Sequence, residues 1–358
     1  MALSHLVSFQ FGLISLAAAV GLYAVFLGLL TTATFQSHVV YLHAIQMTWF
    51  RDLNLPETFG FLRNQVTPFS IKTADNEHVY AWHVLPIELY LKRELALTAE
   101  QTSFARDITS RLAFRLLRDD PEARLVIHMH GAGGTVASGY RVPNYRALSA
   151  GHPGKIHGTP SEAGLIQDAL AVTNWAIYVA GVPASQIVIF GGSIGTAAAV
   201  AVAHHFASQW LPTVFAGTVL VAPFVNGLFL SYRLRRFPAL FEYLLRFIPD
   251  KWLTSERIME MVRTSEVNEE KYRLTNIHAE NDWDVPSHHS ELLFWHAVNE
   301  SVPFDLGAAG TIMEWRTKHG VIREEILKSG LHDVIMGYPV ITMAVMRHFE
   351  ATDPSFTV

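Results

Sequence analysis

The chain opens with an uninterrupted apolar run. Residues 6–32 contain no charged side chain and consist mainly of Leu, Phe, Val, Ala and Gly. A helix of this composition is longer than the roughly 20 residues that cross a bilayer. A cleaved signal peptide, the alternative, usually has a basic start and a shorter apolar core, whereas the first Lys or Arg here is Arg51. The pattern therefore predicts an uncleaved transmembrane anchor over residues 6–32.

Beyond the anchor, residues 33–68 show no clear period and are predicted to be a juxtamembrane segment. Short apolar runs then alternate with helical patterns. Strands are expected over 69–73, 78–85, 124–129, 186–190, 217–222, 274–279 and 311–315, and helices over 87–118, 142–150, much of 223–271 and 334–349. This alternation predicts a doubly wound, mostly parallel sheet covered on both faces, in one domain over residues 69–350.

Composition changes this picture little. Half of the residues are hydrophobic, 16% are charged and the formal net charge is -5, so nothing indicates nucleic-acid binding. Without cysteine there is neither a disulfide framework nor a thiolate metal site. Few Lys or Arg flank the anchor, so the positive-inside rule does not orient it. The sequon at 299–301 is compatible with a lumenal catalytic domain of the endoplasmic reticulum.

A glycine-flanked serine follows the expected strand at 186–190. Residues 191–195 read Gly-Gly-Ser-Ile-Gly, and small residues then continue as a helix. In a strand–turn–helix of the G-x-S-x-G type, a sharp turn lifts the serine hydroxyl above the sheet. Backbone N–H groups at the helix start point toward that hydroxyl. A structural turn serine is the alternative, but the context favours Ser193 as a nucleophile.

A serine hydroxyl needs a base to remove its proton, and the base needs a carboxylate to fix its tautomer. The strand at 274–279 runs into two aspartates, of which Asp282 is the preferred acid and Asp284 the alternative. Solvated loop aspartates are a third reading. The expected base is His332, in the loop before the last helix, and His319 is its rival. Four further histidines are expected to be structural: His128, His204, His205 and His348.

The developing oxyanion needs two fixed donors. One is expected to be the backbone N–H of Ile194, the residue after the nucleophile. Ala132 is the preferred second donor, in a loop made of His130, Gly131, Ala132, Gly133 and Gly134. A phosphate cradle is the alternative for such a loop, but the lysine and spacing of a P-loop are missing. A serine nucleophile of this kind needs neither metal nor cofactor, and none is predicted.

With these motifs the chain resembles the α/β-hydrolase superfamily over about residues 69–349. The segments H-G-A-G-G, G-G-S-I-G, H-A-E-N-D-W-D-V-P and G-L-H-D follow one another in the family's order. Together with its anchor, the chain is most similar to the membrane-bound α/β-hydrolase-domain lipases that act on monoacylglycerols and lysophosphatidylserine. The resemblance implies Ser193 as nucleophile, Asp282 as acid, His332 as base, and a lipid ester as substrate.

The sequence departs from the family's pattern at one place. Members usually have a strand between the oxyanion loop and the nucleophile, ending in a motif like F-D-x-R-G-x-G. Here residues 151–157 read G-H-P-G-K-I-H and lead directly to G-T-P-S, with no apolar run between. One central strand is therefore predicted to be missing. Backbone groups left without that partner would each cost about 1–3 kcal/mol, so the chain is expected to be poorly stable or inactive.

Residues 224–271 are expected to form a lid, in which aromatic and basic side chains interleave over 224–252. Such a mixture suits a membrane interface and anionic lipid head groups, although an ordinary amphipathic cap helix is the alternative. The sequence as a whole predicts a membrane-anchored serine hydrolase that cleaves monoacylglycerol or lysophospholipid through an acyl-enzyme. The alternatives are a serine peptidase of the same fold and a catalytically impaired scaffold.

Overall fold

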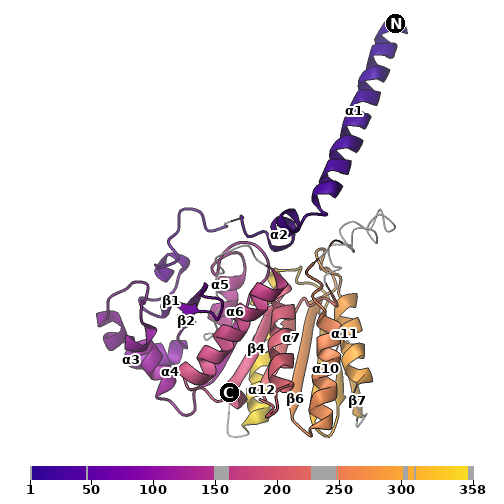
Figure 1. Ribbon diagram of the computed structural model, residues 1–358. Coiled ribbons are helices and arrows are strands. Elements are labelled where there is room, and N and C mark those ends of the chain that lie inside the picture. The colour runs from indigo at the N-terminus through magenta and orange to yellow at the C-terminus, as the bar shows by residue number, and fades with distance from the viewer. Residues whose placement is uncertain are drawn as a thin grey trace.

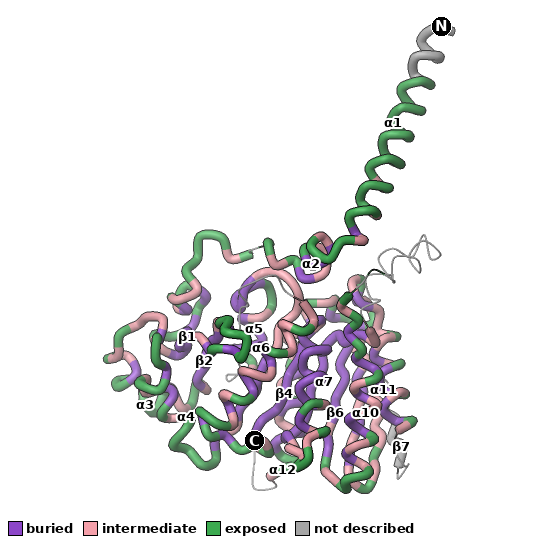
Figure 2. Tube along the Cα trace, in the orientation of Figure 1, coloured by how far each residue is buried: buried purple, intermediate pink, exposed green. Residues whose placement is uncertain are grey.

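The computed structural model describes residues 2–45, 47–148, 161–226, 247, 249–300, 305–309 and 312–353. Its N-terminal helix α1 (Ala2–Leu29) projects away from the rest of the molecule (Figure 1). Within α1, the window Phe9–Leu29 is long and apolar enough to cross a membrane, and none of it is buried. Its large apolar side chains are therefore exposed, as the green tube in Figure 2 shows. A membrane-spanning role for α1 stays a prediction that these features support.

Within the described ranges the main sheet has seven strands, in the order β3-β4-β5-β6-β9-β8-β7. Strands β3, β4, β5, β6 and β9 run parallel, while β8 and β7 add an antiparallel edge. The predicted mostly parallel sheet is thus confirmed. The strand bounds are β3 Leu125–Met129, β4 Ile187–Gly192, β5 Gly217–Val221, β6 Tyr272–Ala279, β7 Asp305–Ala309, β8 Ile312–Arg316 and β9 Gly320–Leu327.

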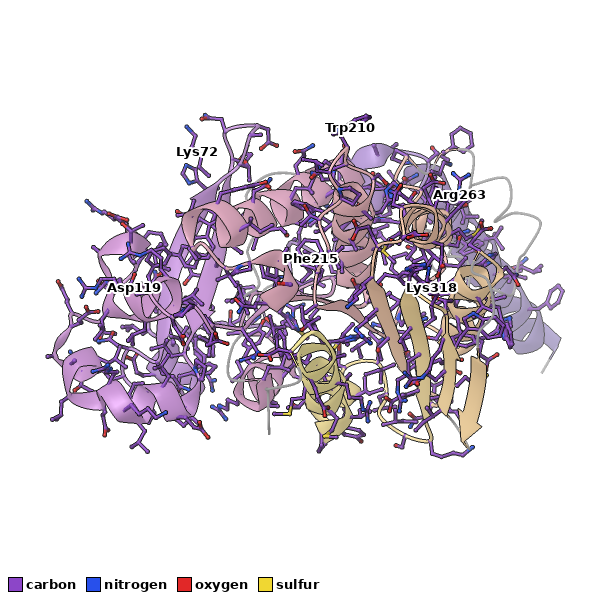
Figure 3. All side chains as sticks on the ribbon, turned by 90° about the horizontal axis from the view of Figure 1, so that it is seen from below. Lys72, Asp119, Trp210, Phe215, Arg263 and Lys318 are labelled. Atoms are coloured by element: carbon purple, nitrogen blue, oxygen red, sulfur yellow. The ribbon has the colours of Figure 1, made fainter. Side chains whose placement is uncertain are left out.

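Helices cover both faces of this sheet, as Figures 1 and 3 show from two directions. One face carries α6 (Glu162–Asn174), α7 (Ile194–Ala207), α10 (Thr254–Val267) and α11 (His288–Asn299), and the other carries α12 (Pro339–Thr352) with α5 (Arg141–Leu148) beside it. Shorter elements are α2 Ala33–Tyr41, α3 Ile87–Ala99, α4 Leu112–Arg118 and the turns η1 Pro56–Phe59, η2 Ile108–Ser110, η3 Trp175–Val179, η4 Ala184–Gln186 and η6 Val334–Gly337.

Strand β4 shows how the sequence builds two cores. Successive side chains of a strand point to opposite faces. Ile187 and Ile189 therefore join the core under α6, α7, α10 and α11, whereas Val188 and Phe190 join the core under α12. All four side chains are fully buried. Helix α7 begins directly after Ser193, and its small residues let it pack closely on the sheet. This packing holds the start of α7 in place.

An antiparallel hairpin of β1 (Val66–Lys72) and β2 (His78–Val84) forms a separate two-stranded sheet. Among the described residues, β3 is paired only on its β4 side. A cavity of about 70 Å³ lies between Val79 of β2, Ile127 of β3 and Asp168 of α6. Burial raises the pKa of the Asp168 carboxyl to about 7. Residues 151–157, where the strand is expected to be missing, lie outside the described residues, so the missing strand stays a prediction.

One helix assignment differs from the sequence-based prediction. The helix expected over 87–118 is interrupted after Ala99, and α4 begins again at Leu112. Glu100 accepts the backbone N–H of Leu112 at 2.9 Å, and Asp107 caps η2 through the N–H of Thr109. These side chains satisfy helix-end donors, which favours an interrupted helix. Phe104, expected on a helix face, instead stacks on Tyr80 in the intervening loop.

Strand β9 was not anticipated because it carries charges in the middle of the sheet. Its residues Arg323, Glu324 and Glu325 break the apolar run that marks a buried strand. Arg323 pairs with Glu314 of β8 at 2.6 Å and with Glu325 at 2.7 Å, whereas the buried Glu324 carboxyl has no hydrogen-bond partner among the described residues, and burial raises its pKa to about 7. Residues 227–246 and 248 of the predicted lid lie outside the described residues. Its later part contains α10, a helix of the sheet-covering layer.

Candidate active site

Ser193 occupies a strained turn between β4 and α7. Its φ of 53° and ψ of -123° lie in a region that non-glycine residues rarely adopt. The backbone N–H of Ser193 donates to the carbonyl of Val221 at 2.9 Å, which ties the turn to β5. A side chain at Gly195 would lie 2.0 Å from the carbonyl oxygen of Met129. Only glycine at that position lets α7 pass so close to β3.

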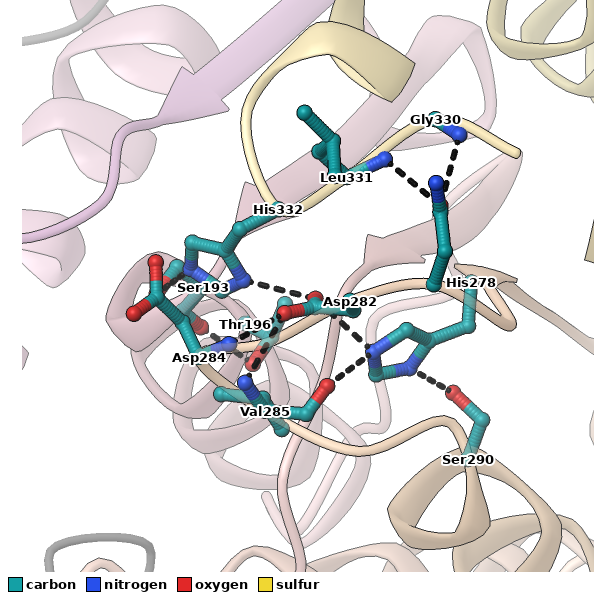
Figure 4. A network of polar contacts seen from close by, with 11 residues as sticks. Ser193, Thr196, His278, Asp282, Asp284, Val285, Ser290, Gly330, Leu331 and His332 are labelled. Atoms are coloured by element: carbon teal, nitrogen blue, oxygen red, sulfur yellow. Dashed lines mark hydrogen bonds and ion pairs between the residues drawn. The ribbon is translucent and has the colours of Figure 1, made fainter. Parts of the chain in front are cut away.

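Ser193, His332 and Asp282 form one continuous hydrogen-bonded chain (Figure 4). His332 Nε2 lies 2.8 Å from Ser193 Oγ, and His332 Nδ1 lies 2.7 Å from Asp282 Oδ2. A carboxylate only accepts hydrogen bonds, so Nδ1 donates to Asp282 and Nε2 is left to accept the Ser193 proton. This is the tautomer that a general base for Ser193 requires.

The Asp282 carboxylate is buried and fully engaged. Its Oδ1 accepts the backbone N–H groups of Asp284 at 2.8 Å and of Val285 at 2.9 Å. Burial raises its pKa, but hydrogen bonds from His278, His332 and the Val285 backbone outweigh that effect and bring the pKa of Asp282 to about 2. Asp282 is therefore ionised at neutral pH, as the partner of a histidine base must be.

A second histidine, His278, also contacts this carboxylate, and sequence analysis missed it. His278 is fully buried near the end of β6, and its Nε2 lies 3.1 Å from Asp282 Oδ2 and 2.9 Å from the carbonyl oxygen of Val285. Both partners accept, so Nε2 donates; Nδ1 then accepts the Ser290 hydroxyl at 2.8 Å. The signal in the sequence was its place four residues before Asp282, at a strand end.

His278 is expected to act as a positioning residue that holds Asp282 in line with His332. His278→Phe removes one hydrogen bond to a charged group, worth about 1.5–3 kcal/mol, so kcat should fall about tenfold or more with KM nearly unchanged. The rate is measured per active site, titrated with a fluorophosphonate. His278→Gln, which keeps a donor, should recover part of the rate. A loss of titratable sites with kcat per site unchanged would instead assign His278 a purely structural role.

In the glycine-rich loop after β3, three successive carbonyl groups bind the same arginine. Arg141 Nη2 donates to the carbonyl oxygens of Gly131 at 2.9 Å, Ala132 at 3.2 Å and Gly133 at 2.7 Å. The Ala132 N–H and the Gly131 carbonyl belong to one peptide group, and in a planar trans peptide these two point in opposite directions. Because the Gly131 carbonyl points toward Arg141, the Ala132 N–H points away from it. Among the described residues, neither this N–H nor that of Ile194 has a hydrogen-bond acceptor. Both donors are thus available to a ligand.

The loop also lies directly against the serine. A Cβ on Gly131 would sit 3.1 Å from Ser193 Cβ, so the absent side chain is what allows this approach. The next two N–H groups are already used: Gly133 donates to the carbonyl of Tyr41 and Gly134 to that of Ile45, both at 2.8 Å. His130 contacts the Gly131 carbonyl oxygen through Nδ1 at 2.8 Å. Arg141, which turns the three carbonyls away from Ser193, was also missed in the sequence.

Solved structures with this arrangement of strands and helices support the assignment of the fold. An α/β-hydrolase of Vibrio vulnificus matches with a TM-score of 0.55, covering 90% of this chain and 92% of that chain at 12% identity. The esterase Pf2001 of Pyrococcus furiosus matches with a TM-score of 0.51, covering 87% of this chain and 98% of that chain at 13% identity. The chain has the α/β-hydrolase fold.

Similar proteins are also found by sequence. The lysophosphatidylserine lipase ABHD12 of Xenopus tropicalis is 24% identical over 274 residues, 72% of this chain and 64% of that protein. The mouse protein of the same name is also 24% identical over 274 residues, 72% of this chain and 63% of its own length. The match thus spans less than two thirds of these relatives. No protein-family model matches the chain.

The fold brings some predicted site residues together and separates others. Asp282 rather than Asp284 contacts His332, and Asp284 lines the cavity above Ser193. His319 precedes β9, whereas Ser193 follows the carboxyl end of the parallel β4, so the two lie at opposite ends of the sheet. Of the four histidines expected to be structural, His128 and His348 are buried, His204 is half-buried and His205 is exposed.

A cavity of about 410 Å³ opens over the site and reaches Ser193, His332 and Ala132. Its volume lies within the range of about 300–1,000 Å³ that is typical of small-molecule sites. Ser193 reaches this cavity from the start of α7. A substrate carbonyl placed there would lie between the Ser193 hydroxyl and the two N–H donors.

Proposed function

We propose that this protein is a membrane-anchored serine hydrolase that cleaves the acyl ester of a single-chain lipid, with Ser193, His332 and Asp282 as its catalytic triad. The observation that carries this proposal is the unbroken hydrogen-bonded chain from the Ser193 hydroxyl through His332 to the buried Asp282. The strained serine turn and the two N–H donors of Ala132 and Ile194 support it further. A nucleophile, a base with its carboxylate and two oxyanion donors are the groups that acyl transfer needs.

The reaction has two halves. Ser193 Oγ attacks the ester carbonyl carbon while His332 Nε2 takes the hydroxyl proton, and the N–H groups of Ala132 and Ile194 stabilise the oxyanion. The intermediate collapses when His332 returns that proton to the leaving alcohol, which leaves an acyl-enzyme on Ser193. Water, deprotonated by His332, then releases the fatty acid and restores the serine. Asp282 stays ionised and stabilises the imidazolium in both halves.

The substrate class follows from the relatives and the site together. The relatives are named lysophosphatidylserine lipases, and an anchored enzyme meets lipid esters at the bilayer. We therefore take lysophospholipid or monoacylglycerol as the substrate, cleaved without a metal or cofactor. Among the described residues no cluster of three or more histidines and carboxylates could hold a metal ion.

The location of the protein is part of the proposal. The helix α1 is taken as a single-pass membrane anchor, with the catalytic domain in the lumen of the endoplasmic reticulum. Asn299 of the sequon is exposed at the end of α11, so an N-glycan could be attached there. A glycosidase-sensitive mass shift that is lost in Asn299→Gln supports this orientation, and its absence in an endoplasmic-reticulum preparation argues against it.

The test of this function is hydrolysis by the full-length chain in vesicles. Lysophosphatidylserine, monoacylglycerol and the matching fatty amides are offered at equal concentration, and released fatty acid is measured. Ester hydrolysis that is blocked by a fluorophosphonate supports the proposal. Cleavage of peptide or amide bonds in preference to esters would favour a peptidase of the same fold.

A catalytically impaired scaffold is the second candidate, and one observation favours it. The cavity of about 70 Å³ between β2, β3 and α6 lies where the hairpin and the main sheet fail to join. If this cavity makes β3 less stable, the loop after β3 no longer holds the Ala132 N–H in position. In that case neither fluorophosphonate labelling nor ester turnover would be observed for this chain, although the triad residues are present.

A further inference from the structure

The cavity over Ser193 extends to the membrane anchor. Its lining includes Phe26 and Leu30 at the end of α1 as well as Ser193 and His332. The helix that would cross the bilayer and the nucleophile therefore border one continuous space. A helix that only tethered the domain to the membrane would not need to line this cavity.

Every lining side chain contributed by the N-terminal segment is apolar. Between residues 26 and 47 these are Phe26, Leu30, Val40, Leu42, Ile45 and Met47, with Val39 beside them. Polar lining side chains come instead from the segments around the site, among them Arg141, Asp284 and Asp333. The cavity thus combines an apolar part at the anchor with a polar part at the serine. A single acyl chain with an ester at its end has the same distribution of polarity.

The apolar part is held in a fixed position. Tyr41 donates its hydroxyl to Asp250 Oδ2 at 2.5 Å, and its carbonyl accepts the N–H of Gly133. Gln36 Nε2 donates to the carbonyl of Phe247 at 2.8 Å. Leu42 takes a left-handed conformation, with φ of 49°, and its Cβ would lie 3.3 Å from a Cβ on Gly133. These contacts attach the segment after α1 to the loop that supplies an oxyanion donor.

The other end of the cavity lies where the membrane would be. The apolar window of α1 ends at Leu29, so Phe26 and Leu30 stand at the end of the span. Figure 1 shows α1 leaving the domain at this point, next to α2. The ends of a spanning helix lie near the boundary between lipid tails and head groups. A lipid tail could therefore pass along α1 from the bilayer into the cavity without crossing water.

We propose that the end of the anchor and the segment that follows it, residues 26–47, form the binding site for the fatty acyl chain of a membrane lipid ester. This inference rests on the proposed function and adds the route and site of the tail. The anchor then serves as part of the substrate site. Burial of the tail against these side chains brings the ester carbonyl to Ser193 and favours long chains over short ones.

The test uses a larger side chain to fill the end of the cavity that lies next to α1. Leu30, which directly follows α1, is buried in the cavity wall, and Leu22 is an exposed residue of α1 outside the cavity. Leu30→Trp and the matched control Leu22→Trp are compared in full-length protein in phosphatidylcholine vesicles. The ratio of kcat/KM for palmitoylglycerol to that for acetylglycerol should fall about tenfold in Leu30→Trp, because a crowded apolar site rejects long chains by this order. Leu22→Trp should keep the wild-type ratio.

A second readout does not need turnover. A palmitoylglycerol with a photoreactive diazirine at the chain end should cross-link to peptides within residues 26–47, less so in Leu30→Trp, and Ile45→Trp should change the pattern as well. Cross-links elsewhere, together with an unchanged palmitoyl-to-acetyl ratio, would overturn this site while ester turnover still supported the proposed function. Cross-links within 26–47 without any ester turnover would support the tail site and count against the hydrolase.

Discussion

Replacing Ser193 with alanine is expected to lower kcat for ester hydrolysis by about 10⁶-fold. The substitution removes the only oxygen that His332 Nε2 contacts at 2.8 Å in the described structure, so no acyl-enzyme can form. The fold should be retained, because the backbone N–H of Ser193, which bonds to Val221, is unchanged. Fatty acid release from lysophosphatidylserine and monoacylglycerol measures the loss, and the thermal midpoint in micelles reports the fold.

Two comparisons sharpen this experiment. Ser208→Ala, an exposed serine at the other end of α7, should leave turnover unchanged. Asp282→Asn should lower kcat by about 10⁴-fold, because an amide no longer fixes the His332 tautomer or stabilises the imidazolium. Turnover by Ser193→Ala at the wild-type rate would remove this serine from the mechanism.

Restoring a strand between residues 150 and 158 is expected to raise both soluble yield and specific activity severalfold or more. The inserted segment should be apolar, of strand length, and end in a motif like F-D-x-R-G-x-G. In the described structure β3 is paired on one side only, and the hairpin β1–β2 stands apart from the main sheet. A strand in the gap would pair the free edge of β3, and each newly paired backbone group would contribute about 1–3 kcal/mol.

An insertion of equal length with a scrambled, polar sequence is the control, since it lengthens the chain without supplying a strand. Yield, thermal midpoint and turnover are compared for the three forms. Equal soluble expression and equal turnover by the original and strand-restored chains would contradict the interpretation that a strand is missing. A gain by the scrambled insertion as well would assign the effect to loop length.

Much of the fold could be predicted because its strands are apolar and fully buried. The runs that became β3, β4, β5 and β6 lie within the predicted ranges or extend them by a residue or two. Strand β9 was not predicted because it carries charged side chains where a buried strand usually has apolar ones. Arg323 forms ion pairs with Glu314 and Glu325 there. Such pairs become visible only once β8 and β9 are side by side.

The proposed site also contains residues that the sequence predicts and residues that it does not. Ser193, Asp282 and His332 were chosen from local motifs, and the structure brings their side chains within hydrogen-bonding distance of one another. His278 and Arg141 could not be found by such motifs. Arg141 donates to three loop carbonyls outside its own helix, and His278 reaches the Asp282 carboxylate four residues on only because the chain turns after β6. Their contribution depends on how the chain folds around them.

The proposed function is tested most directly by isolating the covalent intermediate. The full-length chain is mixed with palmitoylglycerol, quenched in acid within the first turnover and digested, and the peptide that contains Ser193 is weighed by mass spectrometry. The account predicts a palmitoyl group on Ser193 that accumulates, then disappears as fatty acid is released, and is absent in Ser193→Ala. A palmitoyl group on another residue, or ester turnover with Ser193 never modified, would contradict it.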